Sequence, residues 1–166
     1  MLVVLAVEPL VQRLLADEYV LYTRTRNYHW NVIGPRFHDL HKLFEEQYRE
    51  LDEVVDQLAE RSRALGAPAV ATLTEFLQLT RLKEEPNHYP DDRRMVANLL
   101  ADHETLIRQL RNDLETAGDR FHDIGTNDFL TGLLERHEKT AWMLRALLAG
   151  SRLEAGSTTG ELQLLA

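Results

Sequence analysis

The sequence predicts an all-α protein in which four long helices form a bundle and a long crossover joins the second helix to the third. Apolar residues recur at three- and four-residue spacing in four segments, and glycine or proline lies near the ends of these segments. The connection between the second and third segments is about 25 residues long, whereas an up-down bundle uses short loops. With 166 residues, 44% of them hydrophobic, the chain is long enough for one core, so we expect a single domain spanning residues 1–166.

The first helix is expected from near Glu8 to about Val32. Pro9 then lies in the first turn, where its missing N–H costs nothing. Gly34 and Pro35 stop the helix, since proline disfavours helical geometry in the residue before it. The expected buried stripe contains Leu10, Leu14, Leu21 and Thr25, broadened by Val11, Leu15 and Tyr22.

The second helix is expected from near His38 to a C-cap at Gly66. Its apolar face contains Leu40, Phe44, Leu51, Val54, Val55, Leu58 and Leu65. At ~100° per residue, a separate polar stripe forms on another side of the helix. This stripe contains His41, Glu45, Asp52, Asp56 and Glu60.

The crossover contains a short helical candidate at Leu73 to Leu79. The third helix is expected from about Asp91 to Ala117, closing before Gly118, and the fourth from about Asn127 to Ala149, ending at Gly150. Their candidate buried residues are Met95, Leu99, Leu106, Leu110 and Leu114 in the third helix and Phe129, Leu133, Leu134, Ala141, Leu144 and Leu148 in the fourth. Residues 151–166 are rich in glycine, serine and threonine, so we expect a flexible C-terminal tail.

Composition and charge limit the classes of partner. The net charge is -8, from 27 acidic and 19 basic residues, and no lysine-rich tail is present, so DNA binding is not expected. Cysteine is absent, which is compatible with a reducing cytoplasm. The opening MLVVLAV is too short for a signal peptide or a membrane span, so no membrane association is expected.

The polar stripe on the second helix has the spacing of two half-sites for a metal. His41 and Glu45 are one turn apart, as are Asp56 and Glu60, but about 15 residues, or roughly 22 Å, separate the two pairs. One ion cannot touch both pairs on a straight helix. Two copies of the helix, antiparallel about a two-fold axis, would bring His41 of one chain opposite the acidic pair of the other and make two identical sites. Imidazole and carboxylate ligands suit iron, zinc or manganese without choosing among them, and a merely solvated acidic face is the alternative.

Other metal patterns are weak or missing. Glu-x-x-His, which ferritin-like di-iron sites inside one bundle use on two helices, occurs only at Glu85 to His88, in a proline-flanked connection. His103 is flanked by acidic residues that point to other helix faces, so a structural or exposed histidine is expected there. His137 and Glu138 are adjacent in sequence and do not make a natural pair on one ion. No metalloprotease, P-loop or dinucleotide-binding pattern is present.

Four strings in the first half of the chain carry a family resemblance. NYHWNV, GPRF, LHKLFEE and DQLAER, in this order and at this spacing, resemble the signature of the Dps family, the mini-ferritins that protect DNA in stressed bacteria and archaea. The similarity extends from about Leu10 to Leu148. It implies a ferritin-like four-helix bundle assembled into a hollow dodecamer built from two-fold dimers.

The resemblance also implies an activity and a set of residues. Two histidines from one subunit and an aspartate and a glutamate from its neighbour form the family's ferroxidase centre, and they match His29, His41, Asp56 and Glu60, with Glu45 at an adjoining position. This centre oxidises Fe(II) to Fe(III), preferably with hydrogen peroxide, or with oxygen, and the iron is stored in the cavity. Zinc or manganese is expected to be able to occupy the same site. The family likeness further suggests Trp30 as a redox-active aromatic residue beside the centre.

Three aspartates and two glutamates receive further roles from this resemblance. Asp119, Asp123 and Asp128 fall in the segment that lines the family's iron-entry pores, although aspartates there also cap helices and solvate loops. Glu46 and Glu53 are candidates for mineral nucleation. Two alternatives remain: a shell that mainly compacts DNA with weak or no ferroxidase activity, and a plain helical interaction module whose ligand pattern is accidental.

Overall fold

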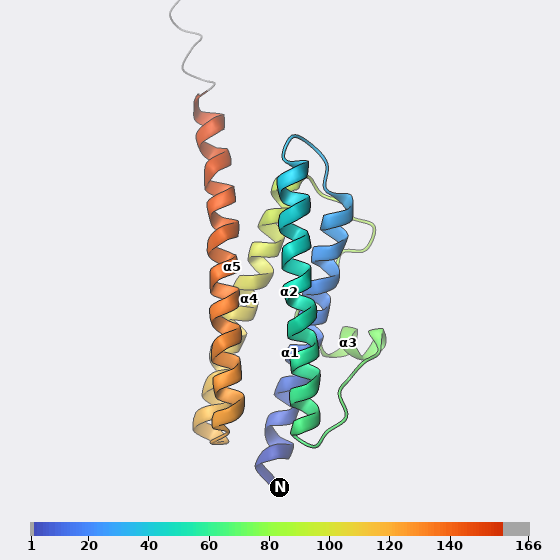
Figure 1. The fold of residues 1–166 in the computed structure, drawn as a ribbon, viewed down its shortest axis with the longest axis vertical. Coiled ribbons are helices and arrows are strands. Elements are labelled where there is room, and N and C mark those ends of the chain that lie inside the picture. Colours follow the sequence, from blue (N-terminus) through green and yellow to red (C-terminus); the bar gives the residue numbers. More distant parts are fainter. Residues whose placement is uncertain (1, 158–166) are drawn as a thin grey trace, which may run out of the picture.

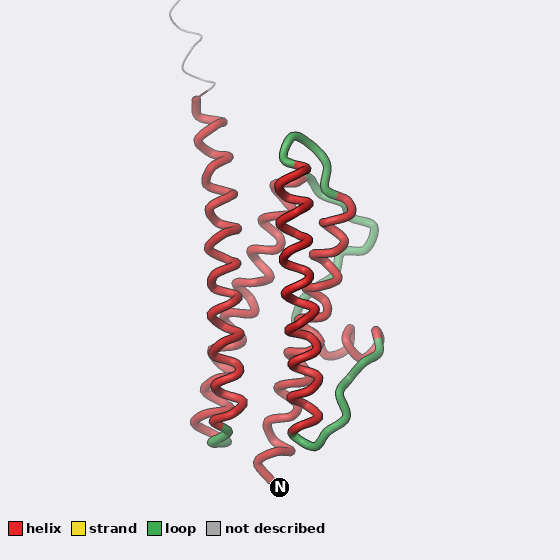
Figure 2. Tube along the Cα trace, viewed as in Figure 1, coloured by secondary structure: helices red, strands yellow, loops and turns green. Residues whose placement is uncertain are grey.

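The computed structural model describes the backbone of residues 2–157 and the side chains of residues 7–149, and all regular secondary structure within that range is helical. Figures 1 and 2 show the long helices side by side and a short helix outside them. The elements are α1 (Leu2–Asn31), α2 (Phe37–Ala64), α3 (Leu73–Leu79), α4 (Asp92–Glu115), the π-helix η1 (Thr116–Arg120) and α5 (Ile124–Ser157). The predicted short helix in the crossover is confirmed with the same bounds.

The crossover decides the topology. Figure 1 shows α1 rising from the N-terminus, α2 and α4 both descending, and α5 rising again, so that α2 and α4 are parallel. Their connection climbs along the outside of the bundle and carries α3 with it, as Figure 2 shows in green. The predicted bundle with a long crossover is therefore confirmed. None of the described helices combines the length and the apolar character needed to cross a membrane.

Two glycines close the ends of α1 and α2 as the sequence predicted. Gly34 (φ 108°) and Gly66 (φ 86°) adopt left-handed backbone conformations that other residues rarely take. The Gly66 N–H donates to the carbonyl of Arg63 (2.9 Å), which completes the C-terminal cap of α2.

Three predicted helix ends were wrong. Helix α1 begins at Leu2 rather than near Glu8, so Pro9 lies inside it; Val7 is fully buried, and this packing favours the additional turns over the hydrogen bond that proline removes. Beyond α4 the chain continues through Gly118 in the wide turn of η1, where the Phe121 N–H donates to the Thr116 carbonyl (3.2 Å). Helix α5 passes through Gly150 to Ser157, so residues 151–157 of the predicted tail are helical, while residues 158–166 lie outside the described residues.

A buried ion-pair network ties the crossover to the bundle. The Asp17 carboxylate on α1 is fully buried and accepts hydrogen bonds from the Thr80 hydroxyl (2.9 Å) and from Nε of Arg81 (2.7 Å). Arg81 also donates to Asp113 on α4 (3.1 Å). One arginine therefore joins α1, α4 and the segment after α3.

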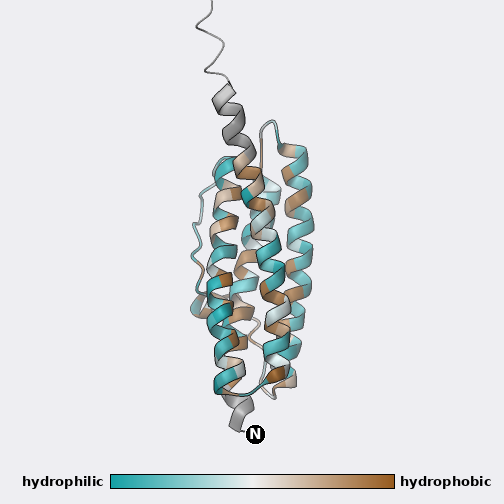
Figure 3. Ribbon diagram, turned by 90° about the vertical axis from the view of Figure 1, so that its left-hand side faces the viewer, coloured by the Kyte–Doolittle hydropathy of each residue, from teal (hydrophilic) through white to brown (hydrophobic). Residues whose placement is uncertain are grey.

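The apolar core consists of two clusters, one nearer each end of the bundle. The lower cluster includes Leu14, Leu58 and Leu110, and the upper one includes Leu21 and Leu99. Figure 3 shows that hydrophobic and hydrophilic residues alternate along each long helix, as expected of helices with one buried face. The positions expected to be buried in α1 to α5 are buried or partly buried. Between the clusters lie polar side chains that the sequence did not predict as core.

Candidate metal centre

His29 and His41 meet where α1 ends and α2 begins. The connection through Gly34 turns the chain back, and the two imidazole rings stack with their centroids 3.8 Å apart. His29 is nearly buried, with 8% of its surface exposed, and His41 is partly exposed. Two of the four predicted ligands therefore come together within one chain.

Reciprocal hydrogen bonds fix the orientation of both rings. Nδ1 of His29 lies 2.8 Å from the carbonyl oxygen of His41, and Nδ1 of His41 lies 2.8 Å from the carbonyl oxygen of His29. Because a carbonyl only accepts, each Nδ1 must carry the proton. In a neutral imidazole this leaves the lone pair on Nε2, which is the form that binds a metal ion.

Aromatic side chains surround this pair. The Tyr48 ring meets His29 edge-on at 5.3 Å, and the Phe37 ring stacks on His41 at 5.0 Å. Trp30 is 65% exposed, and the guanidinium of Arg26 lies over it, 5.0 Å from the ring centroid. Trp30 is thus on the surface, next to His29 in the sequence.

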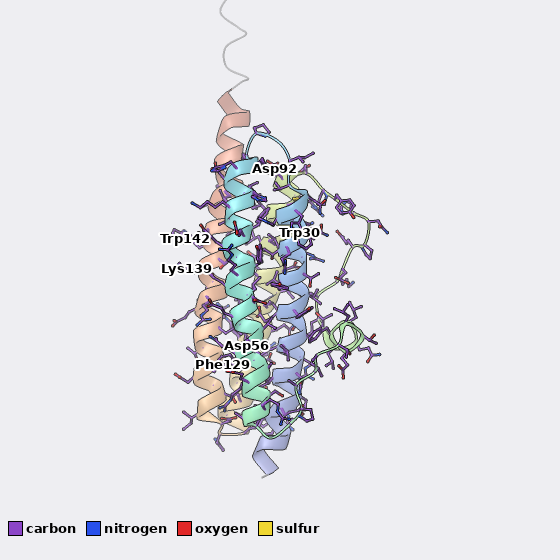
Figure 4. All side chains as sticks on the ribbon, turned by 45° about the vertical axis from the view of Figure 1, so that its right-hand side comes forward. Trp30, Asp56, Asp92, Phe129, Lys139 and Trp142 are labelled. Carbon is purple, nitrogen blue, oxygen red and sulfur yellow. The ribbon has the colours of Figure 1, made fainter. Side chains whose placement is uncertain are left out.

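The acidic pair lies elsewhere on the same helix. Asp56 and Glu60 are both exposed and follow His41 along α2 by roughly 22 Å and 28 Å, at 1.5 Å per residue. Figure 4 shows this separation, with Trp30 in the upper part of the bundle and Asp56 in the lower part. The structure does not bring the acidic pair to the histidines within one chain. Among the described side chains, no three histidine, aspartate or glutamate residues form a group that could hold a metal ion.

Other glutamates of α2 lie in two different surroundings. Glu45 forms an ion pair with Arg49, one turn further along the helix. Glu46 and Glu53 line a groove of about 490 Å³ between α2 and α5, together with Glu50 and Lys139. The candidate nucleation residues therefore share one surface, which is separate from that of the histidine pair.

The three aspartates expected at a pore differ in their surroundings. Asp119 and Asp128 are exposed. Asp123 caps α5 by accepting a hydrogen bond from the Thr126 N–H (3.0 Å), and it pairs with Arg61 (3.1 Å). Although partial burial acts to raise the pKa of Asp123, hydrogen bonds from Thr126 and the charge of Arg61 outweigh it and lower the pKa. For Asp123 the capping role is thus directly visible.

The sequence missed a chain of polar groups inside the bundle. Glu18, His137 and His103, from three different helices, are each at most 3% exposed. His137 contacts Glu18 through Nε2 (2.7 Å) and His103 through Nδ1 (2.8 Å). His103 is therefore buried and not exposed, and the partner of His137 is Glu18 and not its neighbour Glu138. The available signal was Glu18 itself, a carboxylate at the helical spacing of the apolar stripe between Leu14 and Leu21.

Comparison with known proteins gives a consistent family. A family model for a ferritin-like domain matches residues 9–153. The chain is 50% identical to a low temperature-induced protein of Nostoc over 144 residues, which cover 87% of this chain and 80% of that protein. It is 38% identical to DNA protection during starvation protein 2 of Bacillus anthracis over 134 residues, covering 81% and 90% of the two chains.

Solved structures show the same fold. The Dps protein from Bacillus brevis superposes with a TM-score of 0.84 at 35% identity, covering 89% of this chain and 98% of that one. The Dps protein from Vibrio cholerae, a member of a broad superfamily of ferritin-like diiron-carboxylate proteins, gives 0.83 at 34% identity, covering 88% and 91%. A Dps structure from Listeria innocua soaked with zinc gives 0.82 at 28% identity, covering 86% and 96%.

Proposed function

The chain belongs to the Dps family of the ferritin-like superfamily, and from this premise we propose that it is a ferroxidase that oxidises Fe(II) and stores Fe(III) inside a protein shell. The shell is a dodecamer of two-fold dimers, located in the cytoplasm. Consumption of Fe(II) together with hydrogen peroxide protects the cell from hydroxyl radicals. DNA binding is not included, because the chain carries a net charge of -8.

One observation carries the proposal: His29 and His41 form an oriented pair of imidazoles, and among the described side chains of the same chain they are not part of a group of three or more ligands that could hold a metal ion. The complementary pair, Asp56 and Glu60, lies exposed near the other end of the same helix. An antiparallel two-fold contact along α2 joins the two half-sites twice, once at each end. Each dimer then contains two complete centres.

The ligand types suit the reaction. Imidazole nitrogen has affinity for Fe(II), while carboxylate oxygen favours the harder Fe(III) that the reaction produces. Two Fe(II) ions give one electron each to hydrogen peroxide, which takes up two protons and leaves as two water molecules. Glu45 supplies a further carboxylate near the histidines, and the exposed Trp30 can donate an electron when only one Fe(II) is present. Zinc or manganese would compete for the same ligands.

Iron needs a route to and from this centre. Exposed carboxylates at Asp119 and Asp128, repeated about a three-fold axis, would concentrate Fe(II) at an entry pore. Asp123 contributes less there because Arg61 already neutralises it. After oxidation, Glu46 and Glu53 in the α2–α5 groove offer carboxylates on which the ferric mineral can nucleate.

Anaerobic loading of Fe(II) followed by hydrogen peroxide tests the proposal. Ferric absorbance should rise rapidly in the wild type and fall to the protein-free rate in His41→Ala and Asp56→Ala. His38→Ala and Asp52→Ala are matched controls, since each removes an exposed residue of the same type from the same helix. Equal rates in all four variants would leave the helical interaction module as the better explanation.

A further inference from the structure

Glu18, His137 and His103 form a buried chain of hydrogen bonds. The Glu18 carboxylate can only accept, and this fixes which nitrogen donates and which accepts in each following bond. Oε1 of Glu18 accepts from Nε2 of His137, so with both rings neutral the His137 Nδ1 is the acceptor and the His103 Nδ1 is the donor. This leaves the His103 Nε2 as a bare lone pair. It has no hydrogen-bond partner, and His103 is only 3% exposed.

The surroundings of His103 disfavour the charged form of its ring. Burial, and to a lesser degree the neighbouring His137, hold the pKa of the His103 imidazole well below its usual value. A neutral ring with Nδ1–H committed to a neighbour presents Nε2 as a ligand without first losing a proton. This is the arrangement in which a carboxylate and a second-shell group orient a metal-binding histidine.

A cavity of about 30 Å³ has His103 in its lining. His103 lines it from α4, His137 and Thr140 from α5, and Gln47 and Glu50 from α2. Gln47 is 7% exposed, and its Oε1 also has no partner. The remaining lining is Arg136 and the apolar side chains of Leu51, Val54 and Leu133. The two unsatisfied acceptor atoms and the exposed Glu50 give the polar part of the lining groups that a cation would satisfy.

The negative charge of Glu18 supports the same conclusion. Glu18 is fully buried, its Oε1 lies 2.7 Å from Nε2 of His137, and its Oε2 has no hydrogen-bond partner. A buried carboxylate without a compensating charge is costly. A cation on His103 would compensate it through the two imidazoles.

The cavity is reachable from an acidic surface. Gln47, Glu50, Arg136 and Thr140 line both this cavity and the larger α2–α5 groove, which also carries Glu46 and Glu53. With three glutamates against Arg136 and Lys139, the groove carries a small net negative charge, which favours the approach of cations. Arg136 opposes this, although its guanidinium is directed toward the Gln57 side chain (3.5 Å).

We propose that this cavity is a second metal site, which takes one divalent cation of borderline character such as Fe(II), Co(II) or Zn(II). The ligands are the His103 Nε2, the Gln47 Oε1 and the Glu50 carboxylate, and His137 with Glu18 orients and charges the imidazole. A space of about one water molecule admits a single ion. Mixed imidazole and oxygen donors select borderline cations over Mg²⁺ or Ca²⁺.

Anaerobic Co(II) titration of the full chain, in a background that carries His41→Ala and Asp56→Ala, isolates this site from the proposed ferroxidase centre. We expect one Co(II) per chain with the absorption of nitrogen and oxygen ligation. His103→Gln should remove binding, and Glu18→Gln, which acts through His137, should weaken it about 10- to 100-fold. Arg136→Gln should tighten it.

Two substitutions at exposed residues test the site without disturbing the buried core, so that their effect does not depend on folding. Glu50→Gln should weaken Co(II) binding at least about tenfold, whereas Asp52→Asn, exposed on the same helix and outside the cavity lining, should not. Equal binding in Glu50→Gln and Asp52→Asn, or anomalous diffraction from Co(II)-soaked crystals without a peak between His103 and Gln47, would overturn the proposal. Because no oxidant is used and the interface ligands are already removed, a failed ferroxidase assay does not affect this result.

Discussion

Mixed shells of two inactive variants give the sharpest test of a shared ferroxidase centre. His41→Ala removes one half-site and Asp56→Ala removes the other, and roughly 22 Å along α2 separates the two residues. Metal–ligand bonds are about 2 Å long, so no chain can complete its own centre. In a dimer of one variant with the other, one of the two centres has lost ligands from both halves, while the other centre keeps all four.

The expected activity follows from counting. Random assembly of equal amounts gives mixed pairs in about half of the two-fold dimers, and half of the centres in those dimers are intact. About one quarter of wild-type peroxide-dependent Fe(II) oxidation should therefore return after the two variants are unfolded and refolded together, although each alone is inactive. Wild type and His38→Ala, refolded in the same way, calibrate the recovery. A mixture that stays as inactive as its parents refutes shared centres.

Four further outcomes concern stability and iron entry. Arg81→Met leaves the Asp17 carboxylate buried without its cation, so the free energy of unfolding in urea should fall by about 3–5 kcal/mol. Burial lowers the pKa of His103 in the folded state, so below about pH 6.5 the unfolded chain binds a proton that the folded chain does not. The free energy of unfolding should therefore fall as the pH decreases from 7 to 5. In His103→Gln this fall should be less steep. Asp123→Ala should cost about 1 kcal/mol as a lost helix cap, visible in thermal unfolding, whereas Asp119→Asn should slow Fe(II) uptake at unchanged stability.

The sequence was sufficient for the topology because local patterns determine it. Helical periodicity located the long helices, and the length of the crossover implied that α2 and α4 are parallel. Helix ends were less predictable. Gly34 and Gly66 end helices because the backbone turns there with positive φ, whereas Gly118 and Gly150 lie within helical backbone, and the sequence does not distinguish the two situations.

The candidate site was predictable only in part. Its ligand positions came from helix spacing and the family resemblance, but the stacking of His29 on His41 is a tertiary contact across a turn. The link between Glu18 and His137 spans 119 residues of sequence. A local sequence pattern therefore cannot reveal this contact. From the sequence alone, a charged residue such as Glu18 only interrupts the apolar stripe, and its buried partner is known only from the structure.

The ligands that α2 contributes to the two proposed metal sites lie on different sides of the helix. At ~100° per residue, the stripe from His41 to Glu60 occupies roughly 100° of the circumference. Glu46, Glu50 and Glu53 lie together on the next sector, facing the groove toward α5, and Phe44, Leu51 and Leu58 fill the core side. Because the side chains of one sector do not contact those of another, substitutions in the interface stripe should leave Co(II) affinity at His103 unchanged. Since the two sets of ligands are independent, their effects on metal binding should be additive.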